Sequence, residues 1–193
     1  MDSLDNQLAH FNSIPWCSKL LSDPNLIIRP LVSRAYSHKD HAFEYFAKTL
    51  NTPTTIPFFL AFMHPPASQV EATDNVYDAP TGDSDKQSLE SRFATKILDE
   101  CNGAVGVANK MFGLMKPLMH VTHSMSVTYL RPVPVDTTVL VTATLTKVDG
   151  DKKFVVEGEM SDENGKVLVK SEVNYVVLDR QMEAFGSHVK GKF

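Results

Sequence analysis

Apolar residues recur every three to four positions over two stretches of the chain, and they alternate with polar residues over most of its last seventy positions. The helical spacing appears near the N-terminus, where Leu4, Leu8 and Phe11 share one face of a helix. It returns over residues 88–107, where every fourth residue is apolar: Leu89, Phe93, Ile97, Cys101 and Val105. The pattern therefore predicts a short N-terminal helix and one long amphipathic helix.

Two further segments favour helices in the first third of the chain. Ser13 and Pro15 are typical of a helix start and precede the apolar Trp16 and Leu20. Residues 37–53 place Phe43 and Phe46 on one face and end at a proline. We expect residues 1–52 to form an N-terminal helical arm. Either the arm packs over a sheet, or it acts as a lid or as a partner-binding segment.

The strand signals follow. Residues 54–66 are β-branched and aromatic and end at two prolines, and the segments 120–134, 137–148, 152–162 and 166–178 have the alternation of strands. Asp149–Gly150 and Asn164–Gly165 are two-residue type I′ hairpin signals. The interpretation is an α+β domain over residues 53–180, in which an antiparallel meander wraps around the long helix. The polar segment 68–88 is expected to be a loop and residues 181–193 a loosely held tail.

Composition and charge narrow the functional classes. The 193 residues are 42% hydrophobic and 22% charged, with a net charge of −4, which is ordinary for a globular domain and offers no basic surface for nucleic acid. No signal-peptide pattern or membrane-length apolar run is evident, and two distant cysteines fit a reducing compartment. We therefore expect a cytoplasmic protein with no membrane partner.

The known motifs for metals and nucleotides are missing from the sequence. His120 and His123 stand three apart, so in a strand they point to opposite faces and cannot share an ion. There is no phosphate loop, dinucleotide fingerprint or nucleophile elbow. Both Cys17 and Cys101 have apolar surroundings in the sequence and are interpreted as core residues. We expect neither a metal nor a redox cofactor.

Two adjacent carboxylates, Asp99 and Glu100, interrupt the otherwise apolar long helix. Charged groups are seldom buried without a partner or a function. Asp99 is the candidate general base or nucleophile, and Glu100 is the second candidate acid. The alternative is a polar helix face that meets solvent or a dimer partner.

The segment "TKILDECNG" at 95–103 and the segment "THSMSVTYLRPVP" at 122–134 resemble the hotdog fold, and in particular its PaaI-like acyl-CoA thioesterase branch. The strand matches the family pattern at Thr122, Met125, Val127, Tyr129 and Pro132. The resemblance covers residues 85–178, and residues 8–63 more loosely. The leader "HFNSIPWCSKLLSDP" resembles the arm of fungal members, many of which act in secondary-metabolite pathways.

The resemblance implies roles for particular residues. Asp99 aligns with the acidic residue of the family, and Thr122 with the Ser/Thr that orients the attacking water. The family's His-Gly-Gly at the helix start is replaced here by Glu90-Ser91-Arg92. Backbone amides at that place receive the thioester carbonyl in relatives, and a glutamate would oppose the developing negative charge.

Five residues are candidate substrate-binding groups. Ser91 and Arg92 lie at the helix start, where Arg92 would meet an anionic group, and Asn102 would hydrogen-bond a substrate carbonyl. His123 would line the pocket as an acid or base, and Arg131 would contact a phosphate of coenzyme A or a substrate carboxylate. For each, an ordinary structural or solvated side chain is the alternative.

The resemblance leads to three hypotheses. The first is a homodimer, or a dimer of dimers, that hydrolyses an acyl-CoA or carrier-bound thioester, with Asp99 of one chain facing the helix start and the Thr122 strand of its partner. The second is dehydration, isomerisation or cyclisation of a polyketide-like intermediate, suggested by the loss of His-Gly-Gly. The third is a non-catalytic hotdog protein that binds a small apolar ligand or only a partner.

Overall fold

The computed structural model describes residues 4–23, 26–30, 42–47, 58–63, 91–111, 113–134 and 137–181. The predicted loop at 68–88, Glu90 of the replaced motif and the tail from residue 182 lie outside the described residues. No helix in the described segments is long and apolar enough to cross a membrane.

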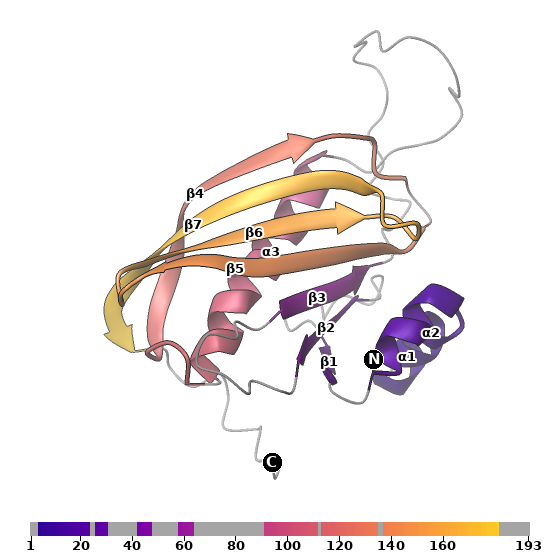
Figure 1. Ribbon diagram of the computed structural model, residues 1–193, viewed down its shortest axis with the longest axis horizontal. Coiled ribbons are helices and arrows are strands. Elements are labelled where there is room, and N and C mark those ends of the chain that lie inside the picture. Colours follow the sequence, from indigo (N-terminus) through magenta and orange to yellow (C-terminus); the bar gives the residue numbers. More distant parts are fainter. Residues whose placement is uncertain are drawn as a thin grey trace, which may run out of the picture.

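The described strands form one antiparallel sheet with a long helix against one of its faces (Figure 1). The strand order is β1-β2-β3-β5-β6-β7-β4. The strands are β1 Leu26–Pro30, β2 Ala42–Ala47, β3 Phe58–Met63, β4 Leu118–Tyr129, β5 Val139–Asp149, β6 Lys153–Ser161 and β7 Val167–Gln181. The helices are α1 Leu4–Asn12, α2 Pro15–Leu21 and α3 Ser91–Met111. This is the α+β hotdog architecture that the sequence predicts.

The main core lies between α3 and the sheet. Ile97, Cys101 and Val105 of the predicted apolar helix face are fully buried, as are Val141 of β5 and Val173 of β7. Along β5 the buried positions are the alternate ones, as expected for a strand with one face on a core. The helix runs past both Gly103 and Gly106, so these glycines do not stop it early.

Both predicted hairpins form, but their turns differ from the type I′ prediction. Residues 150–152 link β5 to β6, one residue more than a type I′ loop holds, and Gly150 has φ +53°. In the second turn the Asp162 carboxylate accepts the N–H groups of Asn164 and Lys166, each at 2.9 Å. Gly165 follows with φ +74°. Side-chain capping by Asp162 thus shapes a longer turn.

The prediction of a simple meander is wrong for β4. This strand pairs with β7, whereas β5 pairs with β3 and β6. Strand order depends on contacts between distant segments, and alternation within one strand does not report it. The result is that β4 lies at the edge of the sheet and Thr122 lies opposite Tyr175.

The helical arm predicted for residues 1–52 is also only partly correct. The first two helices form, but Ala42–Ala47, predicted as helix, is strand β2 between β1 and β3. This segment is rich in aromatic residues, which favour strands, and its pairing on both sides outweighs a weak helical spacing.

The two N-terminal helices make a small second core. Phe11, Cys17 and Leu21 are buried there and pack with Leu140 of β5, whose neighbours Val139 and Val141 belong to the main core. Because alternate strand residues point to opposite faces, α1 and α2 cover the face of the sheet away from α3. Burial raises the pKa of the Cys17 thiol to about 12, as expected for a core cysteine.

Candidate active site

The carboxylate of Asp99 meets the hydroxyl of Thr122 between α3 and β4. Thr122 Oγ1 donates to Asp99 Oδ1 over 3.1 Å. Asp99 is half-buried and Thr122 is exposed, so the pair is open to a ligand. The predicted pair of catalytic residues is therefore brought together within one chain. The prediction that Asp99 would face the Thr122 strand of a partner subunit needs correction, because the chain's own β4 supplies this threonine.

Tyr175 lies beneath this pair. Its ring stacks on Phe154 with centroids 4.7 Å apart and meets the edge of His120 at 5.2 Å. Burial raises the pKa of its hydroxyl first, and the negative charge of Asp99 raises it further, while the nearby Thr122 hydroxyl lowers it. The hydroxyl therefore stays protonated at the floor of the site.

A buried cation lies beyond the aromatic ring of His120. Lys110 Nζ donates to the Leu118 carbonyl and lies 2.6 Å from His120 Nδ1. Burial lowers the pKa of Lys110 to about 8. Burial, then the Lys110 charge, lowers the pKa of His120 to about 4, although a hydrogen bond to the Gly103 backbone raises it. His120 is thus a neutral imidazole whose Nδ1 accepts from the lysine.

The start of α3 is attached to the far end of β4. Tyr129 Oη donates to the Ser91 carbonyl over 2.6 Å and lies at the same distance from Thr95 Oγ1. The predicted ligand Ser91 therefore uses its carbonyl as a structural acceptor. Arg92 is exposed at this end, and Glu100 is half-buried one position after Asp99.

Asn102 was predicted to bind a substrate carbonyl, but its side chain has no exposed surface. Its Nδ2 donates to Ser171 Oγ over 2.9 Å, and a Cβ on Gly158 would stand 2.5 Å from its Oδ1. Contact with a ligand would require this part of the core to open. We therefore correct the assignment of Asn102 from ligand binding to helix–sheet packing.

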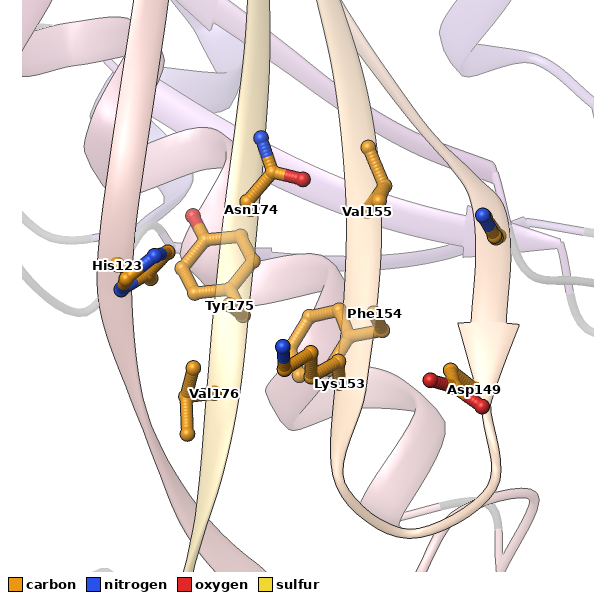
Figure 2. Close-up of a pocket in the computed structure, with 9 residues that line it drawn as sticks. His123, Asp149, Lys153, Phe154, Val155, Asn174, Tyr175 and Val176 are labelled. Atoms are coloured by element: carbon orange, nitrogen blue, oxygen red, sulfur yellow. The ribbon is translucent and has the colours of Figure 1, made fainter.

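His123 lies apart from Asp99. It occupies the irregular step of β4 between Thr122 and Ser124. It lines a shallow groove of about 160 Å³ on the face of the sheet away from α3, with Lys153 and Asn174 among the other lining residues (Figure 2). The face follows from the pairing of Ser124 with Asn174, next to the inward pair of Thr122 and Tyr175.

Arg131 also has a structural partner. Its Nη1 donates to the Val167 carbonyl over 2.6 Å, and its backbone N–H donates to Leu168. The structure therefore joins only Asp99 and Thr122 of the predicted set, and it adds Tyr175, His120 and Lys110. Alternation along β7 indicates that Tyr175 faces inward, but its pairing with Thr122 is a long-range contact that the sequence does not signal.

Within the described parts of the chain, no three His, Cys, Asp or Glu side chains gather as a metal site would require. The arrangement at Asp99 instead suits proton transfer, because a half-buried carboxylate is held by one hydroxyl and keeps oxygen lone pairs for a water molecule.

The family model described as the thioesterase superfamily matches residues 96–169. The fold is the hotdog fold of that superfamily. The matched segment runs from α3 into β7 and includes both Asp99 and Thr122. The resemblance drawn from the helix and the following strand is confirmed over this segment.

Solved structures with this fold are similar at low sequence identity. A hypothetical thioesterase from Streptococcus pneumoniae, solved with coenzyme A, is 13% identical with a TM-score of 0.50, over 65% of this chain and 81% of that one. PaaI from the phenylacetic acid degradation operon of E. coli is 14% identical with a TM-score of 0.50, over 65% and 76%. A Streptococcus mutans protein bound to acetyl CoA is 13% identical with a TM-score of 0.50, over 65% and 84%. None of the curated proteins matches the sequence.

Proposed function

We propose that the protein is a cytoplasmic hydrolase of acyl thioesters and that Asp99 is its general base. The observation that carries the proposal is the hydrogen bond from Thr122 to Asp99 within the segment that matches the thioesterase superfamily. A carboxylate fixed by a hydroxyl at an open edge of the fold has the geometry for activating a water molecule. Glu100, half-buried beside it, is the second candidate acid.

In the proposed reaction, Asp99 removes a proton from water while the water oxygen attacks the thioester carbonyl carbon. The tetrahedral intermediate collapses, the C–S bond breaks, and the thiolate leaves and takes up a proton. Thr122 holds the carboxylate so that the water is correctly oriented. Direct attack by Asp99 on the carbonyl carbon, followed by hydrolysis of the acyl-enzyme, is the nucleophilic version of the same chemistry.

The carbonyl oxygen of the thioester needs hydrogen-bond donors that stabilise its developing negative charge. The first amides of α3, at Ser91 and Arg92, lie seven to eight residues from Asp99, or about 10–12 Å along a helix axis. We infer that the helix start of a second copy provides these amides, across a dimer interface formed at the β4 edge. This gives two equivalent sites per homodimer.

Coenzyme A is the proposed carrier of the acyl group. The two streptococcal structures contain coenzyme A or acetyl CoA, and those ligands belong to those proteins. In this chain, exposed Arg92 and Arg131 are the candidate contacts for its phosphates. Arg131 would keep its bond to Val167 and use its remaining donors.

The test is release of free thiol from short, long and aromatic acyl-CoA substrates by the parent and by Asp99→Asn. We expect turnover to fall at least about a hundredfold in the variant, because the base is lost while its shape is kept. Glu163→Gln, which changes an exposed turn carboxylate, is the matched control and keeps parent turnover. A parent that releases no thiol from any substrate would contradict the proposal.

The replacement of His-Gly-Gly by Glu90-Ser91-Arg92 favours a second candidate. A glutamate and an arginine at the helix start would crowd a groove for pantetheine, and the fold would then serve dehydration, isomerisation or cyclisation of a polyketide-like intermediate in fungal secondary metabolism. Asp99 would move protons in that chemistry. Conversion of a diketide or triketide without thiol release would support it, and binding without conversion would indicate a non-catalytic ligand carrier.

A further inference from the structure

Tyr175 carries a buried hydroxyl that has no formed hydrogen bond. Only 2% of the residue is exposed, and among the described residues no donor or acceptor meets its oxygen in hydrogen-bond geometry. An unpaired buried hydroxyl destabilises the folded state by roughly 1–3 kcal/mol, so a tyrosine at this position needs an explanation. Phenylalanine would fill the same aromatic stack on Phe154 without this cost.

The surroundings of the hydroxyl indicate its partner. Tyr175 is paired across the sheet with Thr122, and both side chains face α3. Thr122 is close enough to influence the titration of Tyr175, although the two hydroxyls are not aligned for a full bond. The oxygen would also be 3.7 Å from a Cβ placed on Gly103, so it reaches the helix at the turn that follows Asp99.

The hydroxyls of Tyr175 and Thr122 and the carboxylate of Asp99 can form a chain of hydrogen bonds in one direction. Thr122 gives its only hydroxyl proton to Asp99 Oδ1, which leaves its oxygen lone pairs free to accept. Tyr175 has a proton to donate, and its own charged form is disfavoured by burial and by Asp99. A small shift of the Tyr175 or Thr122 side chain would complete a chain from Tyr175 through Thr122 to Asp99, in which each bond strengthens the next.

We propose that Tyr175 is a positioning residue of the candidate site, whose hydroxyl donates to Thr122 Oγ1 and thereby holds Thr122 on Asp99. Thr122 is exposed and its side chain has several rotamers, so a fixed second partner is what gives its hydroxyl one orientation. The catalytic part of this inference rests on the proposed function. The part that concerns Thr122 does not.

The first arm of the test needs no substrate. In protein labelled with ¹³C at threonine methyl groups, three-bond couplings report the χ1 angle of Thr122. We expect one rotamer in the parent and averaged couplings in Tyr175→Phe. Ser171→Ala is the matched control, because it removes another buried hydroxyl from the inner face of β7, and Thr122 stays fixed in it. Identical Thr122 couplings in parent and Tyr175→Phe would overturn the proposal.

The second arm measures thiol release against pH. Tyr175→Phe is expected to lower kcat about tenfold with KM within about twofold, and to move the acidic limb of the profile to higher pH. A purely packing role would not move that limb. If the parent turns over and the variant keeps its kcat and limb, the inference fails while the thioesterase proposal stands. If the parent releases no thiol, the thioesterase proposal fails and the Thr122 couplings decide the inference.

Folding is checked by thermal unfolding, and the retained ring should keep Tyr175→Phe folded. Should it not fold, Thr122→Val replaces it. The hydroxyl proton of Tyr175 is then expected to exchange slowly with water in the parent and faster in Thr122→Val. Equal exchange in the two proteins would overturn the proposal.

Discussion

Lys110 is only 6% exposed, and its amine lies between the Leu118 carbonyl, His120 and the ring of Phe154. Moving an ammonium group out of water is unfavourable, and this is why the pKa of Lys110 falls to about 8. His120 cannot share the charge, since its own pKa falls to about 4. The residue therefore links protonation directly to stability.

The free energy of unfolding depends on pH because the folded and unfolded chains bind different numbers of protons at Lys110. Between pH 8 and 10.5 the folded chain has lost the Lys110 proton, whereas an unfolded chain, with the ordinary pKa of 10.5, still holds it. The unfolded state binds more protons, so the free energy of unfolding rises with pH in this range. We expect Lys110→Met to abolish this rise, on the order of 1–3 kcal/mol in total. Urea unfolding at several pH values measures it.

The pH dependence of the free energy of unfolding is compared between the parent and Lys110→Met, which removes the effect of other groups. Cys17 is one such group, because its raised pKa makes the free energy of unfolding fall with pH above pH 9. Lys116→Met is the matched control. Lys116 is exposed, is paired with Asp151 at 2.5 Å, and has a raised pKa, so its removal leaves the pH 8–10 rise in place. If the free energy of unfolding of the parent, measured relative to Lys110→Met, does not rise between pH 8 and 10, the amine is hydrated and the prediction is wrong.

At the scale of elements, the contact between α3 and the sheet depends on two glycines of unequal importance. A Cβ on Gly106 would stand 2.7 Å from Phe154 Cζ and 3.0 Å from the His120 ring. Those rings are packed with Tyr175 and cannot move aside independently. Among the described residues, a Cβ on Gly103 would meet the Tyr175 oxygen alone, at an ordinary 3.7 Å.

The two alanine variants should therefore differ in their effect on stability. Gly106→Ala is expected to destabilise by about 1–3 kcal/mol through overpacking, despite the better helix propensity of alanine. Gly103→Ala is expected to be neutral or to stabilise by up to about 1 kcal/mol, since the glycine cost inside the helix is removed. Chemical denaturation compares them, and equal effects would mean that the helix is not held closely against β6 at Gly106.

At the scale of the whole molecule, we expect copies of the chain to associate through the edge formed by β4. In the described sheet β4 pairs only with β7, and its other edge is open along 12 residues. Val121, Tyr129 and Leu130 are large apolar residues exposed on or beside this strand. Unpaired strand edges are templates for a second strand, and a two-fold pairing of β4 with itself closes the edge.

We expect the protein to sediment as a dimer and Ser126→Lys to sediment as a monomer. Ser126 is exposed on β4, so the substitution leaves the core unchanged while it places charges at a self-complementary edge. Glu163→Lys, in the β6–β7 turn, is the control and stays dimeric. A parent that remains monomeric at high concentration would contradict the proposed interface and the two-chain site.

Most helices and strands of the matched segment, and their buried faces, could be predicted from the order of residues alone. Period-four spacing in α3 and alternation in β5 are properties of neighbouring residues, and burying an apolar face is favourable in any arrangement of the chain. The carboxylate of Asp99 could be named as a candidate because it interrupts the apolar pattern of the helix, whereas the hydroxyl of Thr122 became a candidate through the resemblance of its strand to the thioesterase family. The type of the second turn could not be predicted in this way, because hydrogen bonds to the side chain of Asp162 favour a longer turn than Asn164–Gly165 alone indicates.

Which elements lie side by side became clear from the folded chain and could not be predicted from local patterns. The strand at Ala42–Ala47 is stabilised by β1 and β3, and the pairing of β4 with β7 joins residues about fifty positions apart. That pairing puts Tyr175 under Thr122, while the packing of α3 on the sheet buries Lys110 against His120 and withdraws Asn102 into the core. These contacts depend on strand order and register, which are fixed by packing across the whole sheet and leave no local pattern in the chain.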